Sequence, residues 1–342
     1  MIRVHMVSET EWVTQGQGVH TAFVELVQLL KTDPRVQVVI NNEGGGDIFH
    51  SHTYGPYYFW KGRRYKGRRV LTVHVIPDSS RGTISFWKQL MPLTRAYFKA
   101  VYAYADFVIA ISPTVEQELK KMGVRSEIVR ISNPVLLDNW SRTPENRKKG
   151  RQLLNLKEEE KLVLGVGQLQ PRKGVEDFID MAIAMPEYQF VWVGGRPMGK
   201  FTEGIGRIDK RIKEAPSNVR FLGLLDLAAM PPMYAAADLF IFPSYQENCP
   251  LAPLEAAACG LPVIFRDIPE YAALYNSAYF KAGSTAEFVD QIRMLFTDGE
   301  LYNRATEMSS RLLSEFDQHS VKNQLIDLYQ RTLGKLGDNK RI

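Results

Sequence analysis

Short apolar runs alternate with amphipathic segments of helical period along most of this 342-residue chain. In the first half, apolar runs of strand length lead into candidate helices such as 19–31 and 113–121. A second alternating series begins near residue 161 and continues to about residue 296. Strands that alternate with helices predict βα units and parallel sheets. Because the chain is too long for one ordinary core, we predict an α/β protein with two tandem Rossmann-like domains.

The segment 141–150 is polar and shows neither helical nor strand periodicity, so we expect the connection between the domains there. This places a first domain at 1–143 and a second at 150–317. Near the end of the chain, 320–336 has apolar residues at helical spacing and predicts an amphipathic helix.

The composition limits the possible classes of protein. Hydrophobic residues make up 45% and charged residues 24% of the chain, which argues against a disordered or fibrous protein. The only two cysteines, Cys249 and Cys259, cannot supply a disulfide framework or a cysteine-based zinc site, and they indicate a reducing compartment. We expect neither a secretion signal nor a transmembrane helix, because no apolar stretch is suitable for either.

A glycine-containing loop follows the first predicted strand. Gly16 and Gly18 lead into a helix, where backbone N–H groups can approach an anion. The third glycine of the dinucleotide fingerprint is missing and no acidic residue clearly ends the second strand, so a nicotinamide cofactor is not expected. The loop is therefore either an anion site or a plain tight turn.

Two cations open the second series. Arg172 and Lys173 come after a strand and before a helix, where they suit the stabilisation of a departing diphosphate. A solvated basic turn is the alternative.

Two carboxylates follow a later strand, 238–242. Glu247 lies on a loop and Glu255 in the first turns of an apolar helix. A carboxylate at position 255 can accept hydrogen bonds from two ribose hydroxyls, while nearby backbone N–H groups and the helix dipole favour phosphate. Glu247 would then reach the sugar, and the other predicted donor-binding residues are Asn248, Cys249 and Leu251. For Glu255 the alternative is a structural acid at a helix N-terminus.

Glu247 and Glu255 are separated by seven residues and followed by Ala-Ala-Ala-Cys-Gly-Leu-Pro-Val. With Lys173-Gly174 upstream, this pattern resembles that of the family-4 retaining glycosyltransferases. The resemblance covers nearly the whole chain. It implies the GT-B fold, with two Rossmann-like domains, an interdomain cleft and a last helix, about 318–342, that crosses back to the first domain. It also implies that Lys173 binds the diphosphate, Glu255 the ribose and Glu247 the donor sugar.

In the first half, the resemblance includes three histidines at or near predicted strand ends. His74 resembles the histidine that lies against the donor sugar near the reacting carbon, although a buried structural histidine is the alternative. His50 and His52 are further candidates for the cleft, on the acceptor side. The chain departs from the family pattern at Gln168, where arginine is usual, and at Pro250, which lacks a backbone N–H that could bind phosphate.

Positive charge is concentrated in the first half. Residues 1–150 contain 21 Lys and Arg against 13 Asp and Glu, and Asp78 is the only acidic residue in 57–104. Cations mixed with aromatic side chains suit an anionic membrane surface, whereas a solvated charged face is the alternative. No nucleic-acid motif is present, so we expect no nucleic-acid partner. The candidate acceptor and membrane residues here are Trp60, Arg63, Arg64, Arg68, Arg69, Trp87, Lys88, Arg95 and Lys99.

The resemblance implies metal-independent transfer of a sugar from a nucleotide sugar with retention of configuration. The sequence has no Asp-x-Asp pair, so neither a metal ion nor another cofactor is expected. The chain is similar to bacterial diacylglycerol glucosyltransferases, which implies UDP-glucose, a lipid acceptor and a peripheral position on the cytoplasmic face of the membrane. A transferase for cell-surface polysaccharide or another lipid-linked acceptor, and a catalytically silent binding protein, remain alternatives.

Overall fold

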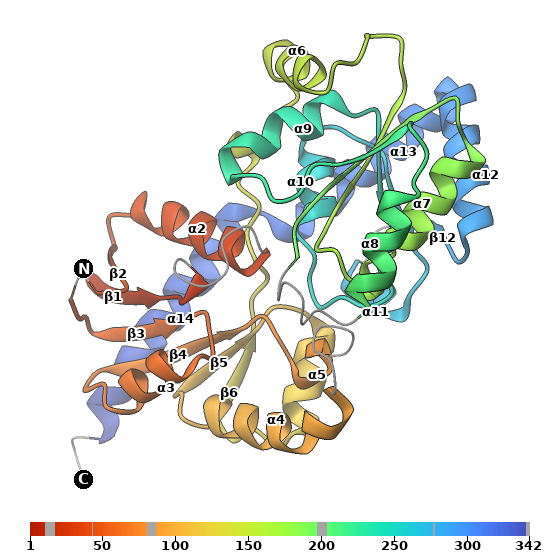
Figure 1. The fold of residues 1–342 in the computed structure, drawn as a ribbon. Helices are drawn as coiled ribbons and strands as arrows, with labels where there is room; N and C mark the ends of the chain where they lie inside the picture. The colour runs from red at the N-terminus through yellow and green to blue at the C-terminus, as the bar shows by residue number, and fades with distance from the viewer. Residues whose placement is uncertain (11–17, 43, 81–86, 197–203, 276–277, 340–342) are drawn as a thin grey trace. The chain divides into compact units, whose positions relative to one another are not determined.

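The computed structural model describes the chain except for residues 11–17, 43, 81–86, 197–203, 276–277 and 340–342. It contains two compact units (Figure 1). Unit 1 comprises Met1–Ser79, Lys88–Val135 and Phe316–Ile342, and unit 2 comprises Ser80–Trp87 and Leu136–Glu315. Each unit is built around a parallel sheet. The predicted α/β class with two Rossmann-like domains is confirmed.

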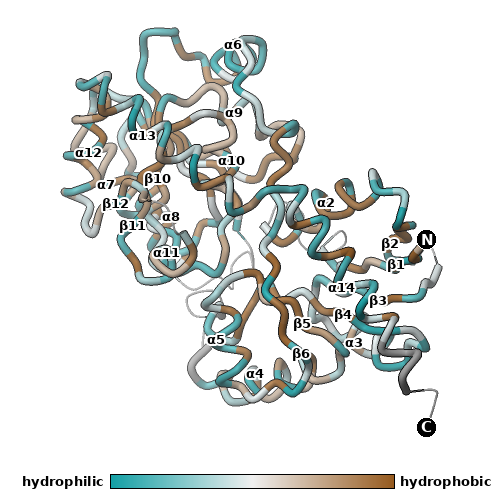
Figure 2. The backbone as a smooth tube through the Cα atoms, turned by 180° about the vertical axis from the view of Figure 1, so that it is seen from behind, coloured by the Kyte–Doolittle hydropathy of each residue, from teal (hydrophilic) through white to brown (hydrophobic). Residues whose placement is uncertain are grey.

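The sheet of unit 1 has the strand order β2-β1-β3-β4-β5-β6, with parallel pairing throughout. Its central strands are almost wholly buried, as expected when helices cover both faces of a parallel sheet. The hydrophobic residues of β5 stand out in Figure 2. The strands are β1 (Ile2–Val7), β2 (Val36–Ile40), β3 (Ile48–Ser51), β4 (Arg68–Val73), β5 (Phe107–Ala110) and β6 (Glu127–Arg130). The helices are α2 (Gly18–Lys31), α3 (Pro56–Arg63), α4 (Trp87–Tyr102), α5 (Pro113–Lys121) and α14 (Gln318–Asn339).

The sheet of unit 2 has the order β12-β11-β10-β7-β8-β9, also parallel. Phe178, Phe190 and Trp192 lie at the centre of its core. The strands are β7 (Leu162–Val166), β8 (Gln189–Val193), β9 (Val219–Phe221), β10 (Leu239–Phe242), β11 (Val263–Arg266) and β12 (Phe280–Ala282). The helices are α6 (Pro144–Leu153), α7 (Val175–Ala184), α8 (Ile205–Lys213), α9 (Met230–Ala236), α10 (Ala252–Ala258), α11 (Pro269–Leu274), α12 (Thr285–Thr297) and α13 (Gly299–Leu312).

The prediction of a linker at 141–150 is wrong, because most of that segment forms α6. Thr143 caps the helix by accepting a hydrogen bond from the backbone N–H of Asn146 at 3.1 Å, and Pro144 occupies the first turn. The helix packs against α9 so closely that a Cβ on Gly150 would clash with the backbone oxygen of Pro232. The two units separate at Val135 instead, so the predicted domain limits at 143 and 150 lie inside unit 2.

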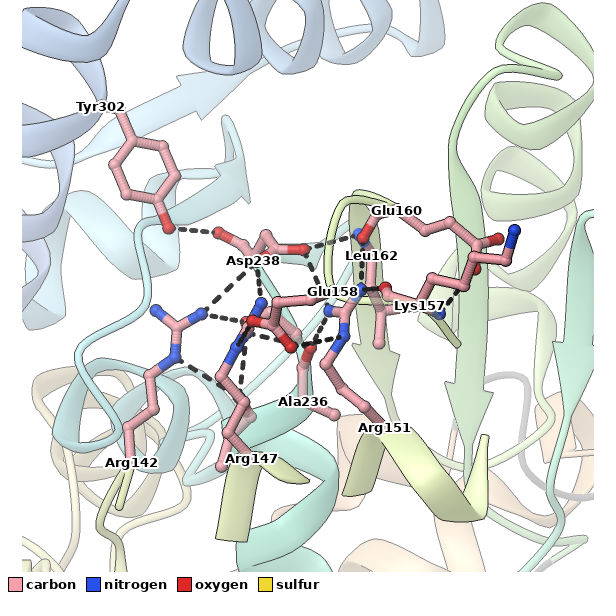
Figure 3. A network of polar contacts seen from close by, with 12 residues as sticks. Arg142, Arg147, Arg151, Lys157, Glu158, Glu160, Leu162, Ala236, Asp238 and Tyr302 are labelled. Carbon is pink, nitrogen blue, oxygen red and sulfur yellow. Dashed lines mark hydrogen bonds and ion pairs between the residues drawn. The ribbon is translucent and has the colours of Figure 1, made fainter. Parts of the chain in front are cut away.

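Polar contacts hold α6 in place (Figure 3). Residues that make such contacts do not produce a hydrophobic repeat of helical period in the sequence. Arg151 is buried and donates to the backbone oxygen of Ala236 at 2.9 Å, at the carboxyl end of α9. Arg142 and Arg147 form ion pairs with Asp238 at 3.4 and 3.1 Å. Cations at the end of a helix stabilise its free carbonyl groups. This explains why a polar segment folds as a helix.

The last helix, α14, belongs to unit 1. Its Tyr329 is fully buried and contacts His50 of β3 at 2.6 Å. Near its start, Asn323 accepts a hydrogen bond from Arg35 at 3.0 Å. Helix α14 thus completes the core of unit 1, although residues Leu136–Glu315, which precede it in sequence, belong to unit 2.

Candidate functional site

A tight turn after β7 brings two cations to the loop that follows β10. Arg172 and Lys173 lie in this turn, and Gly174 next to them has a φ of 73°. A Cβ at position 174 would clash with the backbone oxygen of Pro243. Because β7 and β10 are neighbours in the sheet, their carboxyl ends meet at one edge, where open parallel sheets bind ligands.

Glu247 receives three polar contacts in this place. The ammonium group of Lys173 donates a hydrogen bond to its Oε1, as does the Ser244 hydroxyl at 2.6 Å. The guanidinium group of Arg172 lies 3.8 Å from the same oxygen. The side chains of Lys173 and Glu247 are only 13% and 10% exposed. The structure therefore brings together three of the predicted donor-binding residues.

The electrostatics favour an ion pair. Burial raises the pKa of Glu247, but attraction to Lys173 and Arg172 and hydrogen bonds from Lys173 and Ser244 outweigh it, so the pKa lies below its ordinary value. Burial also lowers the pKa of Lys173, and the contact with Glu247 opposes this shift. The lowered pKa of Glu247 favours its ionised form beside the Lys173 ammonium group.

Several buried polar atoms around this pair have no hydrogen-bond partner among the described residues. They are Nε of Arg172, Oε1 of Gln246 and the hydroxyl of Tyr271. The pKa of Tyr271 is raised, first by burial and then by the nearby charge of Glu247. Buried polar groups are nearly always satisfied in folded proteins, so such a group of atoms is suited to a polar ligand.

Glu255 is held by a different contact. It lies in the first turn of α10, is 6% exposed, and accepts a hydrogen bond from the Tyr234 hydroxyl at 2.5 Å. Asn248 and Cys249 are half-buried in the loop before α10, and Leu251 is buried at its start. All four belong to the segment that follows β10, as does Glu247.

The three histidines form one buried group in unit 1. Nδ1 of His52 lies 3.1 Å from Nε2 of His74, and the rings of His50 and His52 are tilted toward each other with centroids 4.5 Å apart. Both ring nitrogens of His50 are engaged, by Tyr329 at 2.6 Å and Thr72 at 2.7 Å. Burial lowers the pKa of His50 to about 3 and that of His74 to about 4, and the pKa of His52 lies well below its ordinary value for the same reason. All three imidazoles are neutral at pH 7.

Two predicted features lie partly or wholly outside the described residues. Gly16 is not described, whereas Gly18 is the first residue of α2, and no atom of the described residues lies within 4 Å of its Cβ position. Trp87 and Lys88 lie in the first turn of α4, and the placement of their side chains is not described.

The predicted basic surface divides into two groups. Arg68 and Arg69 of β4 form ion pairs with Asp106 at 3.5 and 3.3 Å. Arg95 of α4 lies 3.5 Å from Asp78 and 3.7 Å from Glu118. These carboxylates neutralise the three arginines in part, so they are less available to an anionic surface.

The second group lies on and directly after α3. Trp60 is 55% exposed, and the guanidinium group of Arg63 lies 5.9 Å from the centroid of its ring. Among the described residues, neither Arg63 nor Arg64 forms an ion pair. Lys99 is exposed on α4. Of the predicted membrane surface, this geometry favours the exposed cations that lie next to the exposed indole of Trp60.

Sequence reasoning missed Arg266, which is 4% exposed at the end of β11. It donates to the backbone oxygen of Pro243 at 2.7 Å, pairs with Asp177 at 3.2 Å and stacks on the Tyr245 ring at 3.8 Å. These contacts connect the end of β11 to α7, through Asp177, and to the loop after β10, through Pro243 and Tyr245. An arginine at the end of an apolar strand was the available signal.

Within the described ranges, no three His, Cys, Asp or Glu side chains are placed to hold a metal ion.

Comparison with known proteins identifies the family. A model described as "Glycosyltransferase Family 4" matches residues 12–139, and one described as "Glycosyl transferases group 1" matches residues 146–311. The alpha-galactosylglucosyldiacylglycerol synthase of Streptococcus pneumoniae is 30% identical over 338 residues, which cover 96% of this chain and 90% of that protein. The chain belongs to the family-4 glycosyltransferases.

Other family members match over shorter stretches. The processive diacylglycerol alpha-glucosyltransferase of Acholeplasma laidlawii is 34% identical over 199 residues, which cover 58% of this chain and 59% of that protein.

Solved structures confirm the GT-B fold of this glycosyltransferase. The sucrose-phosphate synthase of Thermosynechococcus elongatus matches with a TM-score of 0.80 and 18% identity, covering 98% of this chain and 100% of that one. Anabaena HepE, in complex with UDP and glucose, matches with a TM-score of 0.77 and 17% identity, covering 97% of this chain and 100% of that one. Within the described ranges, no helix has the length and apolar character needed to cross a membrane.

Proposed function

We propose that this glycosyltransferase moves glucose from UDP-glucose to diacylglycerol with retention of anomeric configuration, giving α-glucosyldiacylglycerol. Such a product is a potential anchor precursor for lipoteichoic acid. The names of the two relatives above, both enzymes of diacylglycerol glycolipids, support a lipid acceptor. The observation that carries the donor site is the cluster of the half-buried Lys173 and Arg172 with the buried Glu247 at the carboxyl edge of the unit 2 sheet.

Each donor-site residue has a distinct task. The diphosphate displaces Glu247 as the partner of Lys173 and Arg172, since two phosphate groups carry more charge than one carboxylate. Glu247 then accepts hydrogen bonds from the glucose hydroxyls, while Ser244 continues to hold it. Glu255, oriented by Tyr234, accepts hydrogen bonds from the ribose hydroxyls.

The transfer step needs no nucleophile from the protein. The bond between the anomeric carbon and the diphosphate oxygen breaks while the acceptor hydroxyl oxygen bonds to the same face of that carbon. The departing diphosphate oxygen takes the proton of the acceptor hydroxyl, and its negative charge is stabilised by Lys173 and Arg172. Burial lowers the pKa of His74 to about 4, so this histidine is neutral and supplies no charge to the step. No metal ion or other cofactor takes part in the proposed step.

The lipid acceptor places the enzyme at a membrane surface. We propose that it binds peripherally to the cytoplasmic face, with the exposed Trp60, Arg63 and Arg64 of unit 1 toward anionic lipid. Each cation near such a surface contributes on the order of 1 kcal/mol.

The Streptococcus pneumoniae relative favours a second candidate. Its name describes a lipid that carries both galactose and glucose, so a sugar-bearing lipid is an alternative acceptor and galactose an alternative donor sugar for this chain.

A panel of UDP-glucose, UDP-galactose and GDP-mannose, each with diacylglycerol or glucosyldiacylglycerol in mixed micelles, tests both candidates. Release of UDP with formation of α-glucosyldiacylglycerol supports the first, and Glu255→Ala abolishes this release. The matched control is Glu300→Ala, which removes an exposed carboxylate from the first turn of α13. No turnover with any pair would favour a catalytically silent binding protein.

A further inference from the structure

Arg266 is a buried arginine at the end of β11, and the proposed sugar transfer assigns no task to it. The other residues of β11 are Val-Ile-Phe, and all four residues of the strand are buried. A buried ion pair commonly stabilises a fold no more than apolar side chains of similar volume do. Stability alone therefore does not account for an arginine that is only 4% exposed at this position.

The guanidinium group of Arg266 uses its planar fork in three directions. Its Nε donates a hydrogen bond to the backbone oxygen of Pro243 at 2.7 Å, and Nη1 donates to the backbone oxygen of Gly283 at 3.3 Å. Its Nη2 lies 3.2 Å from the carboxylate of Asp177, and its Cζ lies 3.8 Å from the centroid of the Tyr245 ring. The ammonium group of a lysine could not reach these partners together, because it is a single point charge.

Two of these partners belong to the loop that carries Glu247. Pro243 and Tyr245 lie on either side of Ser244, which is fully buried. The Ser244 hydroxyl donates to Oε1 of Glu247 at 2.6 Å. Arg266 therefore holds the backbone next to the residue that orients the Glu247 carboxylate.

The same loop is also held by the two cations after β7. Nη1 of Arg172 donates to the backbone oxygen of Gln246 at 3.0 Å, and the ammonium group of Lys173 donates to Glu247. In the proposed function these charged groups turn to the diphosphate, so both contacts weaken when the nucleotide sugar binds. Within the described residues, Arg266 forms no hydrogen bond or ion pair with Arg172, Lys173 or Glu247. Its contacts to the loop therefore do not compete with the diphosphate.

We propose that Arg266 is a positioning residue for sugar transfer. It keeps the loop after β10 in place when Glu247 exchanges Lys173 for the glucose hydroxyls, and it acts without touching the nucleotide sugar. The inference rests on the proposed function, because it concerns the step in which Glu247 holds the sugar.

Arg266→Met tests the proposal, since the flexible side chain of methionine fills irregular space without making the hydrogen bonds. The kcat for transfer from UDP-glucose to diacylglycerol should fall by about 30- to 100-fold, because misplacing a group by about 1 Å costs on the order of 100-fold. UDP alone should bind within about threefold of the wild-type affinity, because it has no sugar for Glu247 to hold. The unchanged number of UDP sites per chain verifies that the variant is folded. Arg266→Lys, which keeps a positive charge beside Asp177, should recover part of the rate.

The matched control is Arg207→Met. Arg207 of α8 also pairs with a carboxylate in the first turn of α7, that of Glu176 at 2.6 Å, but its side chain is exposed. Among the described residues it forms no hydrogen bond or ion pair with the loop after β10, so its loss should leave kcat unchanged. Equal losses of kcat in both variants, or no loss in Arg266→Met, would overturn the proposal. A loss of UDP affinity as large as the loss of kcat would also overturn it, because Arg266 would then support the nucleotide rather than the sugar.

Hydrogen–deuterium exchange of the unliganded chain separates this proposal from the proposed function. The peptide containing residues 243–249 should exchange about tenfold faster in Arg266→Met than in the wild type, while β7 keeps its protection. Unchanged exchange in this loop would overturn the proposal. If the wild-type chain transfers no glucose to any lipid, the proposed function fails, and the exchange of the loop still decides whether Arg266 holds it. If Arg266→Met does not fold, Tyr245→Ala takes its place, since this side chain is 50% exposed and its ring stacks on the guanidinium group.

Discussion

The buried histidines make unit 1 sensitive to acid. The pKa of His50 is held at about 3 and that of His74 at about 4, whereas an imidazole in the unfolded chain titrates near 6.5. In the interval between these values the unfolded chain binds more protons, so the free energy of unfolding falls as the pH falls. This stability is fully present above about pH 6.5 and is lost as the pH falls towards the folded values. Between about pH 7 and about pH 5, each histidine removes about 2 kcal/mol, or about 4 kcal/mol for the two.

Hydrogen–deuterium exchange of the backbone amides measures this loss in each unit separately. The amides of β3 and β4, corrected for the intrinsic pH dependence of exchange, should lose protection between pH 7 and pH 5. Unit 2 provides an internal control because it contains no histidine, so β7 and β8 should keep theirs. His50→Gln should reduce the slope in unit 1 by up to about 1.4 kcal/mol per pH unit. The reasoning is refuted if both units respond equally or if this variant leaves the slope unchanged.

Three further variants test the site and the fold of unit 2. Glu247→Gln removes the carboxylate that competes for Lys173, so UDP should bind at least as tightly in calorimetry while sugar transfer falls by on the order of 100-fold. Tyr234→Phe removes the hydrogen bond to Glu255 and should weaken UDP binding by about fivefold. Gly150→Ala forces α6 away from α9 and should lower the free energy of unfolding of unit 2 by about 2 kcal/mol in urea.

Each of these variants has an outcome that contradicts the argument. Weaker UDP binding by the Glu247 variant would mean that this carboxylate supports the nucleotide rather than competing with it. Unchanged UDP affinity after loss of the Tyr234 hydroxyl would remove its assigned part in orienting Glu255. For α6, the exposed Lys149→Ala is the control, and an equal effect of both substitutions would argue against the close approach at Gly150.

The sheets were predictable from sequence because buried parallel strands are continuous apolar runs. The predicted strand 238–242 corresponds to β10, Leu239–Phe242. Helices whose contacts are polar were not predictable in the same way. Helix α6 carries no apolar period, since its arginines bind the end of α9 and Asp238.

Some residues of the candidate site were likewise predictable from sequence and others were not. Lys173 and Glu247 were identified from their positions after strands, and the sheet order brings them together. Arg266 ends an apolar strand but was missed, because its partner Asp177 is distant in sequence. Tyr234 could not be found this way, because it follows no strand and its contact with Glu255 is fixed only by packing. The pairing of Arg68 and Arg69 with Asp106 likewise depends on strand register, which charge counting along the chain cannot show.

Calorimetric titration of UDP-glucose into the wild-type chain and two lysine variants tests the donor site most directly. The wild type and Lys213→Met, which alters an exposed lysine in the last turn of α8, should bind with the same affinity. Lys173→Met should bind about 10- to 100-fold more weakly, because a buried charge-assisted contact with the diphosphate is lost. Equal affinities for all three chains would contradict the assignment of the Lys173–Glu247 cluster as the place where the nucleotide sugar binds.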